Sequence, residues 1–263
     1  MFAFWYQNAP DGVEIIPTYI GFRQSTPETF RAGIQRAEEL AEQLAGYGCT
    51  AIVVSGSPPF LLEGPVFEQE WGEALSKRLG IPVITPMAPH IVASKAQGIT
   101  SVAIASYYGT ELVDAIVRYF DHFGIDAQAF PGYSRPGAEP SALYSTSLSD
   151  LDAVDRYEVY RYCKQGFAEL ARPVDAIYIN GGGWDAAPAV DLLERDLRMP
   201  VVFALAAEMW RTYRVLQIEA GITDCGALLR GDTSTAQIRT AAAGRGDRAG
   251  QSWPQGRGEG MTQ

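Results

Sequence analysis

The chain has 263 residues, of which 47% are hydrophobic and 20% are charged, a composition typical of a globular protein with a sizeable core. Its formal net charge of −10 argues against nucleic acid or an anionic membrane surface as the main partner. No apolar run approaches the roughly 20 residues that a membrane-spanning helix needs.

Cysteine and histidine, two common metal-binding residue types, are scarce in this sequence. The three cysteines, Cys49, Cys163 and Cys225, lie far apart without metal-like or disulfide-like spacing, which favours a reducing compartment. Only two histidines occur, so we expect no multi-histidine metal site. We therefore expect a cytoplasmic protein that works without a metal or cofactor.

Apolar residues alternate between helical spacing and short strand-like runs along the chain. The first part predicts a helix over 25–48, a strand over 50–56, a helix over 67–80, a strand over 81–87 and a helix over 90–98. A strand over 101–109, a helix over 110–124 and a strand over 126–130 follow. From 148 onward the pattern restarts, with a helix over 150–171, a strand over 175–183, a helix over 189–198, a strand over 200–205 and a helix over 208–221. This alternation predicts an α/β fold with parallel sheets.

Two short segments have the same design: "AIVVSGSPP" from Ala51 and "AIYINGGGW" from Ala176. Each is a strand that ends in a glycine-containing turn, and the flanking elements recur in the same order. We therefore predict two similar Rossmann-like units related by a pseudo-two-fold axis. Ligands bind beyond the carboxyl ends of parallel strands, so both turns would face one cleft that holds the active site. The alternative is two ordinary turns that never meet.

The predicted first unit takes residues 1–97 together with about 198–230, and the second unit takes 98–197. The segment 231–263 is rich in glycine, arginine, glutamine and serine and has little to bury. We therefore expect a disordered tail.

Several motifs together resemble the aspartate/glutamate racemase superfamily, in particular its arylmalonate decarboxylase and maleate cis-trans isomerase branch. They are "FWYQNAPDGVEIIPTYIGFR", "SGSPPFLLEGPVF", "AIASYYG" and "YINGGGWDAAPAVDLLERDLRMPVV", and they extend over about residues 4–226. The resemblance implies a duplicated α/β fold with the active site between the halves. It also implies a strand that precedes Phe4, so we expect this sequence to be truncated.

The resemblance implies a catalytic cysteine in each glycine-rich turn of the racemases and isomerases, and in the second turn alone of the decarboxylases. Here Gly56 and Gly181 occupy these positions, so both thiols are missing. The three cysteines lie elsewhere and are expected to be small apolar residues of the interior. Two-base racemisation and isomerisation through a covalent thioether are the reactions most weakened by this departure.

The residues that would recognise a carboxylate are still largely present, although both thiols are missing. Ser57 matches a hydroxyl and Tyr108 a tyrosine that, in the decarboxylases, surround a carboxylate and its enediolate, whereas Pro58 replaces a second hydroxyl. Unpaired backbone N–H groups at a strand-to-helix turn also attract anions. The expected substrate-binding residues are Gly56, Ser57, Tyr108, Asn180, Gly181, Gly182 and Gly183.

His90 and Glu208 are candidates for the missing proton donor, because each lies just after a "PV" strand near the start of a helix. A histidine titrates in the useful range, although such a residue also serves as an ordinary helix cap. Glu208 also has an ordinary explanation in the helix dipole. Asp185 and Asn180, which flank the second turn, are further candidates alongside Glu208. Tyr107 and Tyr108 are adjacent on a strand, so one should face the core and the other the cleft.

These residues predict a cofactor-independent lyase that acts on a small carboxylate, most like decarboxylation of a malonate-type diacid through an enediolate. Its catalytic residues would be Tyr108, Ser57, His90 and Glu208. One alternative is a racemase-like or maleate-isomerase-like enzyme with non-cysteine acid–base groups. Another is a non-catalytic carboxylate-binding protein. A homo-oligomer is left open.

Overall fold

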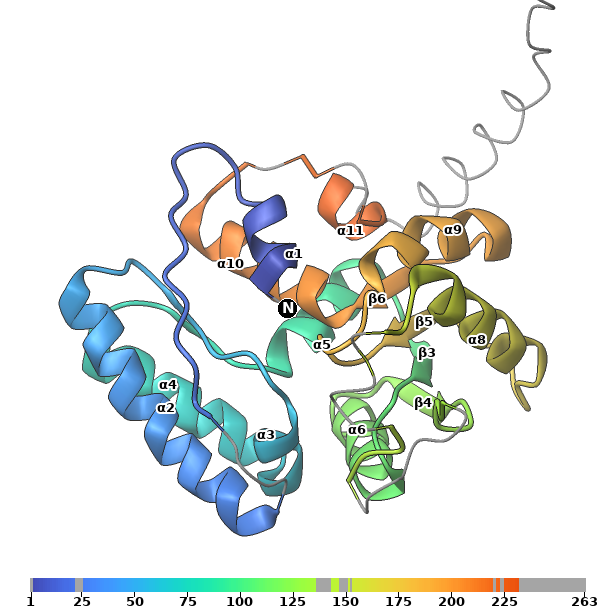
Figure 1. Cartoon of the computed structure of the whole chain (residues 1–263), viewed down its shortest axis with the longest axis horizontal. Coiled ribbons are helices and arrows are strands. Elements are labelled where there is room, and N and C mark those ends of the chain that lie inside the picture. Colours follow the sequence, from blue (N-terminus) through green and yellow to red (C-terminus); the bar gives the residue numbers. More distant parts are fainter. Residues whose placement is uncertain are drawn as a thin grey trace, which may run out of the picture.

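The computed structural model describes residues 2–21, 26–135, 143–146, 151, 153–219, 221–222 and 225–231. Apart from Gly231, the expected disordered tail lies outside these residues. The described chain forms an α/β fold with parallel strands in two sheets, as the sequence predicts (Figure 1). Among the described helices, none has the length and apolar content that crossing a membrane requires.

The larger sheet contains four parallel strands in the spatial order β4-β3-β5-β6. Their bounds are Ser101–Ala105 for β3, Asp126–Ala129 for β4, Ala176–Ile179 for β5 and Val201–Phe203 for β6. Every residue of β5 is buried, as expected of a parallel strand covered on both faces. The strand expected over 126–130 is confirmed as the edge strand β4.

Helices cover both faces of this sheet. Their bounds are Ala88–Ala96 for α5, Thr110–His122 for α6, Arg156–Ala168 for α8, Ala187–Leu197 for α9 and Ala204–Leu216 for α10. Helices α8 and α9 pack against each other on one face, and α5 and α10 pack against each other on the other (Figure 1). Right-handed crossovers between parallel strands produce this two-sided arrangement.

The smaller sheet pairs β1 (Ile52–Val53) with β2 (Val83–Ile84). Its separate hydrophobic core is covered by α2 (Pro27–Tyr47) and α4 (Pro65–Leu79). The strands expected over 50–56 and 81–87 therefore shorten to two paired residues each. A short helix that the sequence analysis did not predict, α3 (Pro58–Glu63), begins directly after the first glycine turn.

The strand after residue 198 corrects the expected unit boundary. The sequence analysis assigned about 198–230 to the first unit, but β6 pairs with β5 in the larger sheet, with Ile177 opposite Val201. Helix α10, which starts directly after β6, packs against α5 and β2. The chain therefore passes from the larger sheet toward the first unit at Phe203, and α10 joins the two.

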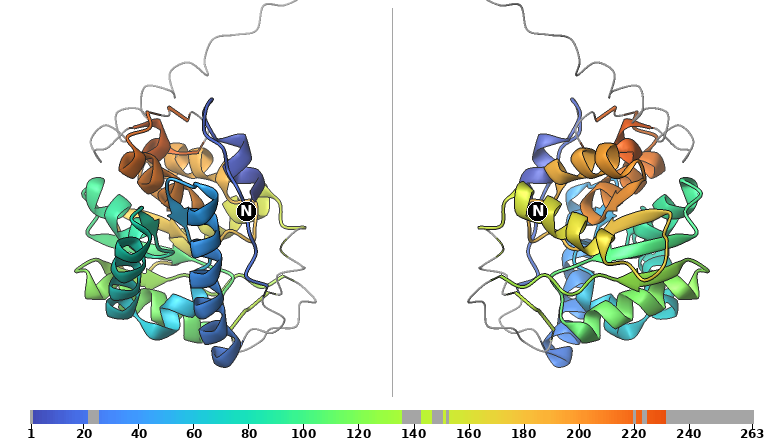
Figure 2. Two further views of the ribbon diagram at one scale, coloured as in Figure 1. Left: turned by 90° about the vertical axis from the view of Figure 1, so that its left-hand side faces the viewer. Right: turned by 90° about the vertical axis from the view of Figure 1, so that its right-hand side faces the viewer.

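The N-terminal residues are attached to this junction. Helix α1 (Phe2–Gln7) places Phe4 edge-on against Phe203 at 5.7 Å between ring centroids, and Tyr213 of α10 donates a hydrogen bond to the carbonyl of Asn8. Figure 2 shows α1 beside α10 from two sides. At the other end, α11 (Ala227–Arg230), also not predicted, is held by buried Glu194, which accepts from the Ala227 amide and pairs with Arg230.

Candidate functional site

The structure brings together the two hydroxyls that were expected to bind a carboxylate. Ser57 precedes α3, but its hydroxyl does not cap that helix. Instead, Ser57 Oγ lies 3.1 Å from the Oη of Tyr108, which follows β3. Both side chains are buried, with 6% and 4% exposure. The first glycine turn and the larger sheet therefore meet at this pair, although 51 residues separate the two in the chain.

Tyr107 connects this pair to the second glycine turn. Its ring packs edge-on against Tyr108 at 5.0 Å, and its Oη accepts a hydrogen bond from the Gly183 amide at 3.2 Å. A Cβ atom built on Gly181 would lie only 2.5 Å from Tyr107 Oη. One of the two tyrosines was expected to face the core and the other a cleft; both are buried, and each contacts a different turn.

The ring of Tyr107 therefore occupies the space that a side chain at position 181 would need. Gly56 differs, because a Cβ built there meets nothing within 4 Å. Both glycines have positive φ, +83° at Gly181 and +114° at Gly56, so a side chain at either position also strains the backbone.

We expect Gly181→Ala to become less destabilising when Tyr107 is shortened to leucine, because the steric clash disappears while the backbone strain remains. The expected coupling is about 1–3 kcal/mol. Gly56→Ala is the matched control, and its cost should be the same with and without Tyr107→Leu. Urea unfolding of the two cycles measures this, and equal costs of Gly181→Ala in both backgrounds would contradict the assigned clash.

Glu208 forms a buried acid next to the first turn. It lies on α10 with 3% exposure, and its Oε2 accepts a hydrogen bond from Ser55 Oγ at 2.8 Å. Burial raises the pKa of Glu208 from 4.5 to about 8, with a further rise from the charge of Glu68 and an opposing effect of the Ser55 hydrogen bond. At neutral pH, Glu208 is therefore mainly a neutral carboxylic acid that can give up a proton.

This raised pKa predicts a pH-dependent stability. A group whose pKa is higher in the folded state contributes stability below its unfolded pKa of 4.5 and loses that contribution as the pH rises through about 8. The unfolding free energy of the wild type should therefore fall relative to that of Glu208→Gln over this range, by on the order of 5 kcal/mol. Denaturant unfolding at pH 5 and pH 8.5 measures the difference, and parallel curves for the two proteins would contradict it.

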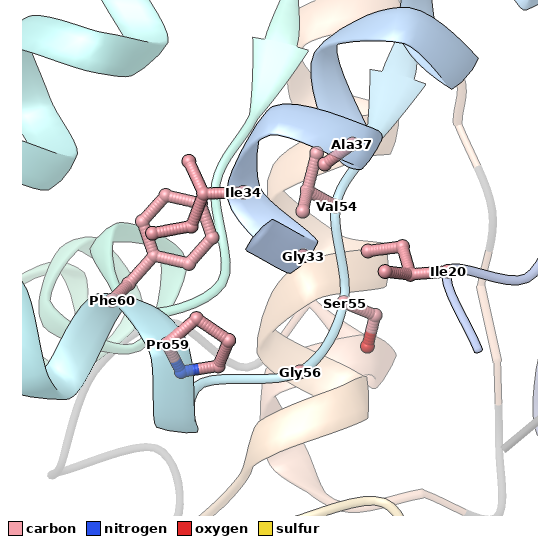
Figure 3. Close-up of a pocket in the computed structure, with 9 residues that line it drawn as sticks. All are labelled: Ile20, Gly33, Ile34, Ala37, Val54, Ser55, Gly56, Pro59 and Phe60. Atoms are coloured by element: carbon pink, nitrogen blue, oxygen red, sulfur yellow. The ribbon is translucent and has the colours of Figure 1, made fainter. Parts of the chain in front are cut away.

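A small hollow opens beside the first turn (Figure 3). Ser55 and Gly56 form part of its wall, and the rest is apolar: Ile20, Gly33, Ile34, Ala37, Val54, Pro59 and Phe60. Of the described residues in the second turn, none lines this hollow. The sequence analysis expected one cleft lined by both turns, whereas here Tyr107 and Tyr108 fill the space between them. Glu208 does not line the hollow either, and reaches it through Ser55.

His90 lies away from the hollow. It is 1% exposed, and its Nδ1 lies 2.9 Å from Tyr178 Oη. Tyr178 donates its one hydroxyl proton to Asn180 Oδ1, so Nδ1 of His90 must carry a hydrogen that it donates to Tyr178. Burial lowers the pKa of His90 to about 3. A neutral, buried imidazole argues against the expected role of His90 as proton donor, and indicates that it positions Tyr178.

The polar groups of the second turn are mostly engaged within the protein. The side chain of Asn180 accepts from Tyr178 and donates to Ser106 Oγ at 3.3 Å, and the Gly183 amide donates to Tyr107. Asp185 is exposed. The substrate-binding roles expected of Asn180 and Gly183 therefore conflict with the hydrogen bonds that these residues make, and the first turn carries the better-placed groups.

Two functional candidates, Ser55 and Glu68, were missed by the sequence analysis. Ser55 stands beside the first glycine, but a serine in a strand-ending turn carries no specific signal. Glu68 lies in an amphipathic helix, yet it is fully buried and accepts hydrogen bonds from the amides of Met87 and Ala88; burial raises its pKa.

Two of the three cysteines are buried as expected, whereas Cys49 is only half-buried. Cys163 is buried, and burial raises the pKa of its thiol, as expected of an inert interior residue. Cys225 is also buried, and its thiol donates to Asn8 Oδ1. Among the described residues, no three or more histidine, cysteine, aspartate or glutamate side chains are grouped so as to bind a metal ion.

Comparisons with known proteins agree with this architecture. Residues 8–229 match the family model described as "Arylmalonate decarboxylase". The arylmalonate decarboxylase of Bordetella bronchiseptica is 25% identical over 206 residues, which are 78% of this chain and 81% of that protein. A crystal structure of arylmalonate decarboxylase has a TM-score of 0.68 at 21% identity and covers 77% of this chain and 84% of its own. The maleate isomerase Iso from Pseudomonas putida S16 has a TM-score of 0.69 at 19% identity, with 80% and 82% covered.

Proposed function

Because the chain belongs to the arylmalonate decarboxylase family, we propose that it decarboxylates a small malonate-type diacid, with hydroxyl and carboxyl groups in place of a thiol. The observation that carries this proposal is the cluster at the first turn. There, the Ser57–Tyr108 hydroxyl pair and the Ser55–Glu208 pair lie on either side of Gly56. The Ser57–Tyr108 pair supplies hydrogen-bond donors for an anion, and Glu208 of the other pair holds a proton.

Ser57 and Tyr108 are suited to hold the carboxylate that stays on the substrate. In the structure their hydroxyls are hydrogen-bonded to each other, and when both turn to one carboxylate they supply two O–H donors. Burial raises the pKa of Tyr108 well above its ordinary value, so its hydroxyl keeps its proton. As carbon dioxide leaves, negative charge grows on the oxygens of the enediolate, and donors fixed beforehand in a buried site stabilise that charge most strongly.

Glu208 is suited to supply the proton that completes the reaction. The bond between the α-carbon and the departing carboxylate breaks, its electron pair stays on the enediolate, and the α-carbon then takes one proton. With a pKa of about 8, Glu208 still holds its proton at neutral pH and regains it from solvent after each turnover. The reaction then consumes one proton and needs no redox partner.

Racemisation and cis-trans isomerisation are less well supported. Two-base racemisation requires an acid and a base on opposite faces of the substrate. Glu208 lies on the side of Gly56, whereas the position of Gly181 is filled by Tyr107, a phenol whose pKa is raised by burial. His90 is neutral and bonded to Tyr178. This asymmetry favours a reaction that needs one proton from one side.

The test uses the full chain with a panel of aryl- and alkylmalonates, and follows carbon dioxide release together with thermal shift. We expect release from at least one diacid, accompanied by stabilisation of the protein. Stabilisation without release would instead indicate a non-catalytic carboxylate-binding protein. Neither release nor stabilisation across the panel would reject a malonate-type ligand.

A further inference from the structure

We propose that Ser55 is a catalytic residue whose hydroxyl passes the proton of Glu208 to the substrate carbon on the side of Gly56. This inference rests on the proposed decarboxylase function and deepens it. It assigns a role to a residue outside the anion-binding pair, and it predicts the handedness of the reaction.

Glu208 lies behind Ser55, away from the hollow. Glu208 is 3% exposed and does not line the hollow, whereas half-buried Ser55 does. Their 2.8 Å hydrogen bond joins the buried acid to the wall of the hollow. Figure 3 shows Ser55 on the stretch of chain that leads to Gly56. In this contact Ser55 is the donor, so the relay requires the Ser55 hydroxyl to turn toward the substrate and to accept the proton of Glu208 along the same path.

Residues 55, 56 and 57 follow one another along the first turn in an order that suits the reaction. Ser55 carries the proton route, Gly56 leaves open space in which a Cβ would meet nothing within 4 Å, and Ser57 joins Tyr108 in the anion-binding pair. Ser57 and Tyr108 do not line the hollow themselves, so the reacting carbon would lie at Gly56, between the residue that carries the proton route and the residue that holds the carboxylate.

The second glycine turn, on the side opposite Gly56, is filled by Tyr107. Tyr107 lies against Gly181 and is fixed there by the Gly183 amide. Asn180, the polar residue before Gly181, is engaged by Tyr178 and Ser106. Asp185, the carboxylic acid among the described residues of this turn, is exposed. Protonation from the Gly56 side alone would give one enantiomer from a substrate with two different α-substituents.

The proton transfers balance. The α-carbon forms a C–H bond with the proton from Ser55 Oγ as that O–H bond breaks, and the proton of Glu208 moves to Ser55 Oγ and restores the hydroxyl. Glu208 is left as a carboxylate and takes a proton from solvent. The titratable groups that face Glu208 are Glu68 on α4 and Tyr178 on β5. Glu68 is fully buried, Tyr178 stays neutral and neither lines the hollow, so neither competes with Glu208 as a proton donor there.

The experiment compares Ser55→Ala with Ser55→Thr on an α,α-disubstituted malonate, and measures kcat, its pH dependence and the enantiomeric excess of the product. We expect Ser55→Ala to lose about 100-fold in kcat and to give nearly racemic product, because water then protonates either face. Ser55→Thr keeps the hydroxyl and should stay within a few-fold of the wild type, with the handedness unchanged. A purely structural role of Ser55 would lower stability without changing the enantiomeric excess.

A double variant separates the relay from simple positioning. If the proton passes from Glu208 through Ser55, Ser55→Ala combined with Glu208→Gln should be no slower than the worse single variant. Multiplied losses in the double variant, or wild-type rate and enantiomeric excess in Ser55→Ala, would overturn the relay. If the wild type releases no carbon dioxide from any malonate, the proposed function fails instead, and the relay fails with it.

Discussion

Glu208→Gln is expected to lower kcat for decarboxylation by about 10²–10⁴-fold and to leave KM within a few-fold of the wild type. Glutamine keeps the shape of the side chain and can still accept the hydrogen bond from Ser55, but it cannot release a proton. KM should change little, because Glu208 lies behind Ser55 rather than in the wall of the hollow. Steady-state rates with a malonate that the wild type turns over provide the measurement.

The pH dependence of kcat gives an independent check. The protonated form of Glu208 is the active one, so kcat of the wild type should be constant at lower pH and fall as the pH rises through about 8. Glu194→Gln is the matched control. Glu194 is also a buried glutamate, with a pKa raised by burial to about 7, but it holds α11 through Ala227 and Arg230. This control should lose stability and keep the pH profile, whereas an unchanged profile in Glu208→Gln would rule out Glu208 as the acid.

Tyr108→Phe is expected to lower kcat by about 10²–10³-fold, since one donor to the developing enediolate is removed. The variant also leaves the buried hydroxyl of Ser57 without its partner, so we expect a stability loss of about 1–3 kcal/mol. Carbon dioxide release and thermal unfolding measure the two effects separately. Binding of a saturated monocarboxylate should weaken less than catalysis, because the hydrogen bond is strongest when charge is concentrated on the enediolate.

Tyr213→Phe provides the control for this prediction. Tyr213 is another buried tyrosine, but its hydroxyl donates to the carbonyl of Asn8, where α10 meets the N-terminal residues. Its loss should lower stability by about 1 kcal/mol with kcat unchanged. Equal kcat losses in both variants would mean that the effect of Tyr108 is structural, and full activity of Tyr108→Phe would remove Tyr108 from the site.

Burial of Glu208 determines both its action as an acid and the pH dependence of the stability of the fold. Burial raises the pKa of Glu208, which gives the protein a proton donor at neutral pH. Burial also makes the ionised form costly, so the fold loses stability where Glu208 ionises. Replacement of this residue should therefore stabilise the protein above pH 8 and inactivate it. Such opposite effects on stability and activity are typical of functional sites.

The sequence by itself determined the fold class, the order of most elements and the location of the two glycine turns. These features depend on local patterns: apolar periodicity, helix caps such as Thr26 and glycines with positive φ. The resemblance to the decarboxylases also placed Ser57 and Tyr108 around one carboxylate. The sequence placed Glu208 among the candidates for the proton donor without separating it from His90.

Only the tertiary structure decided which candidate could act as an acid. Glu208 and His90 are both buried, yet burial favours the uncharged form of each, so it makes the glutamate an acid at neutral pH and the histidine a neutral base with no proton to spare. The contact between Ser55 and Glu208 joins residues 153 positions apart, and the packing of Tyr107 against Gly181 joins two different strand ends. The pairing of β6 with β5 is likewise a contact that only the tertiary structure reveals. Burial and long-range contact depend on how elements pack, and local sequence patterns do not specify that packing.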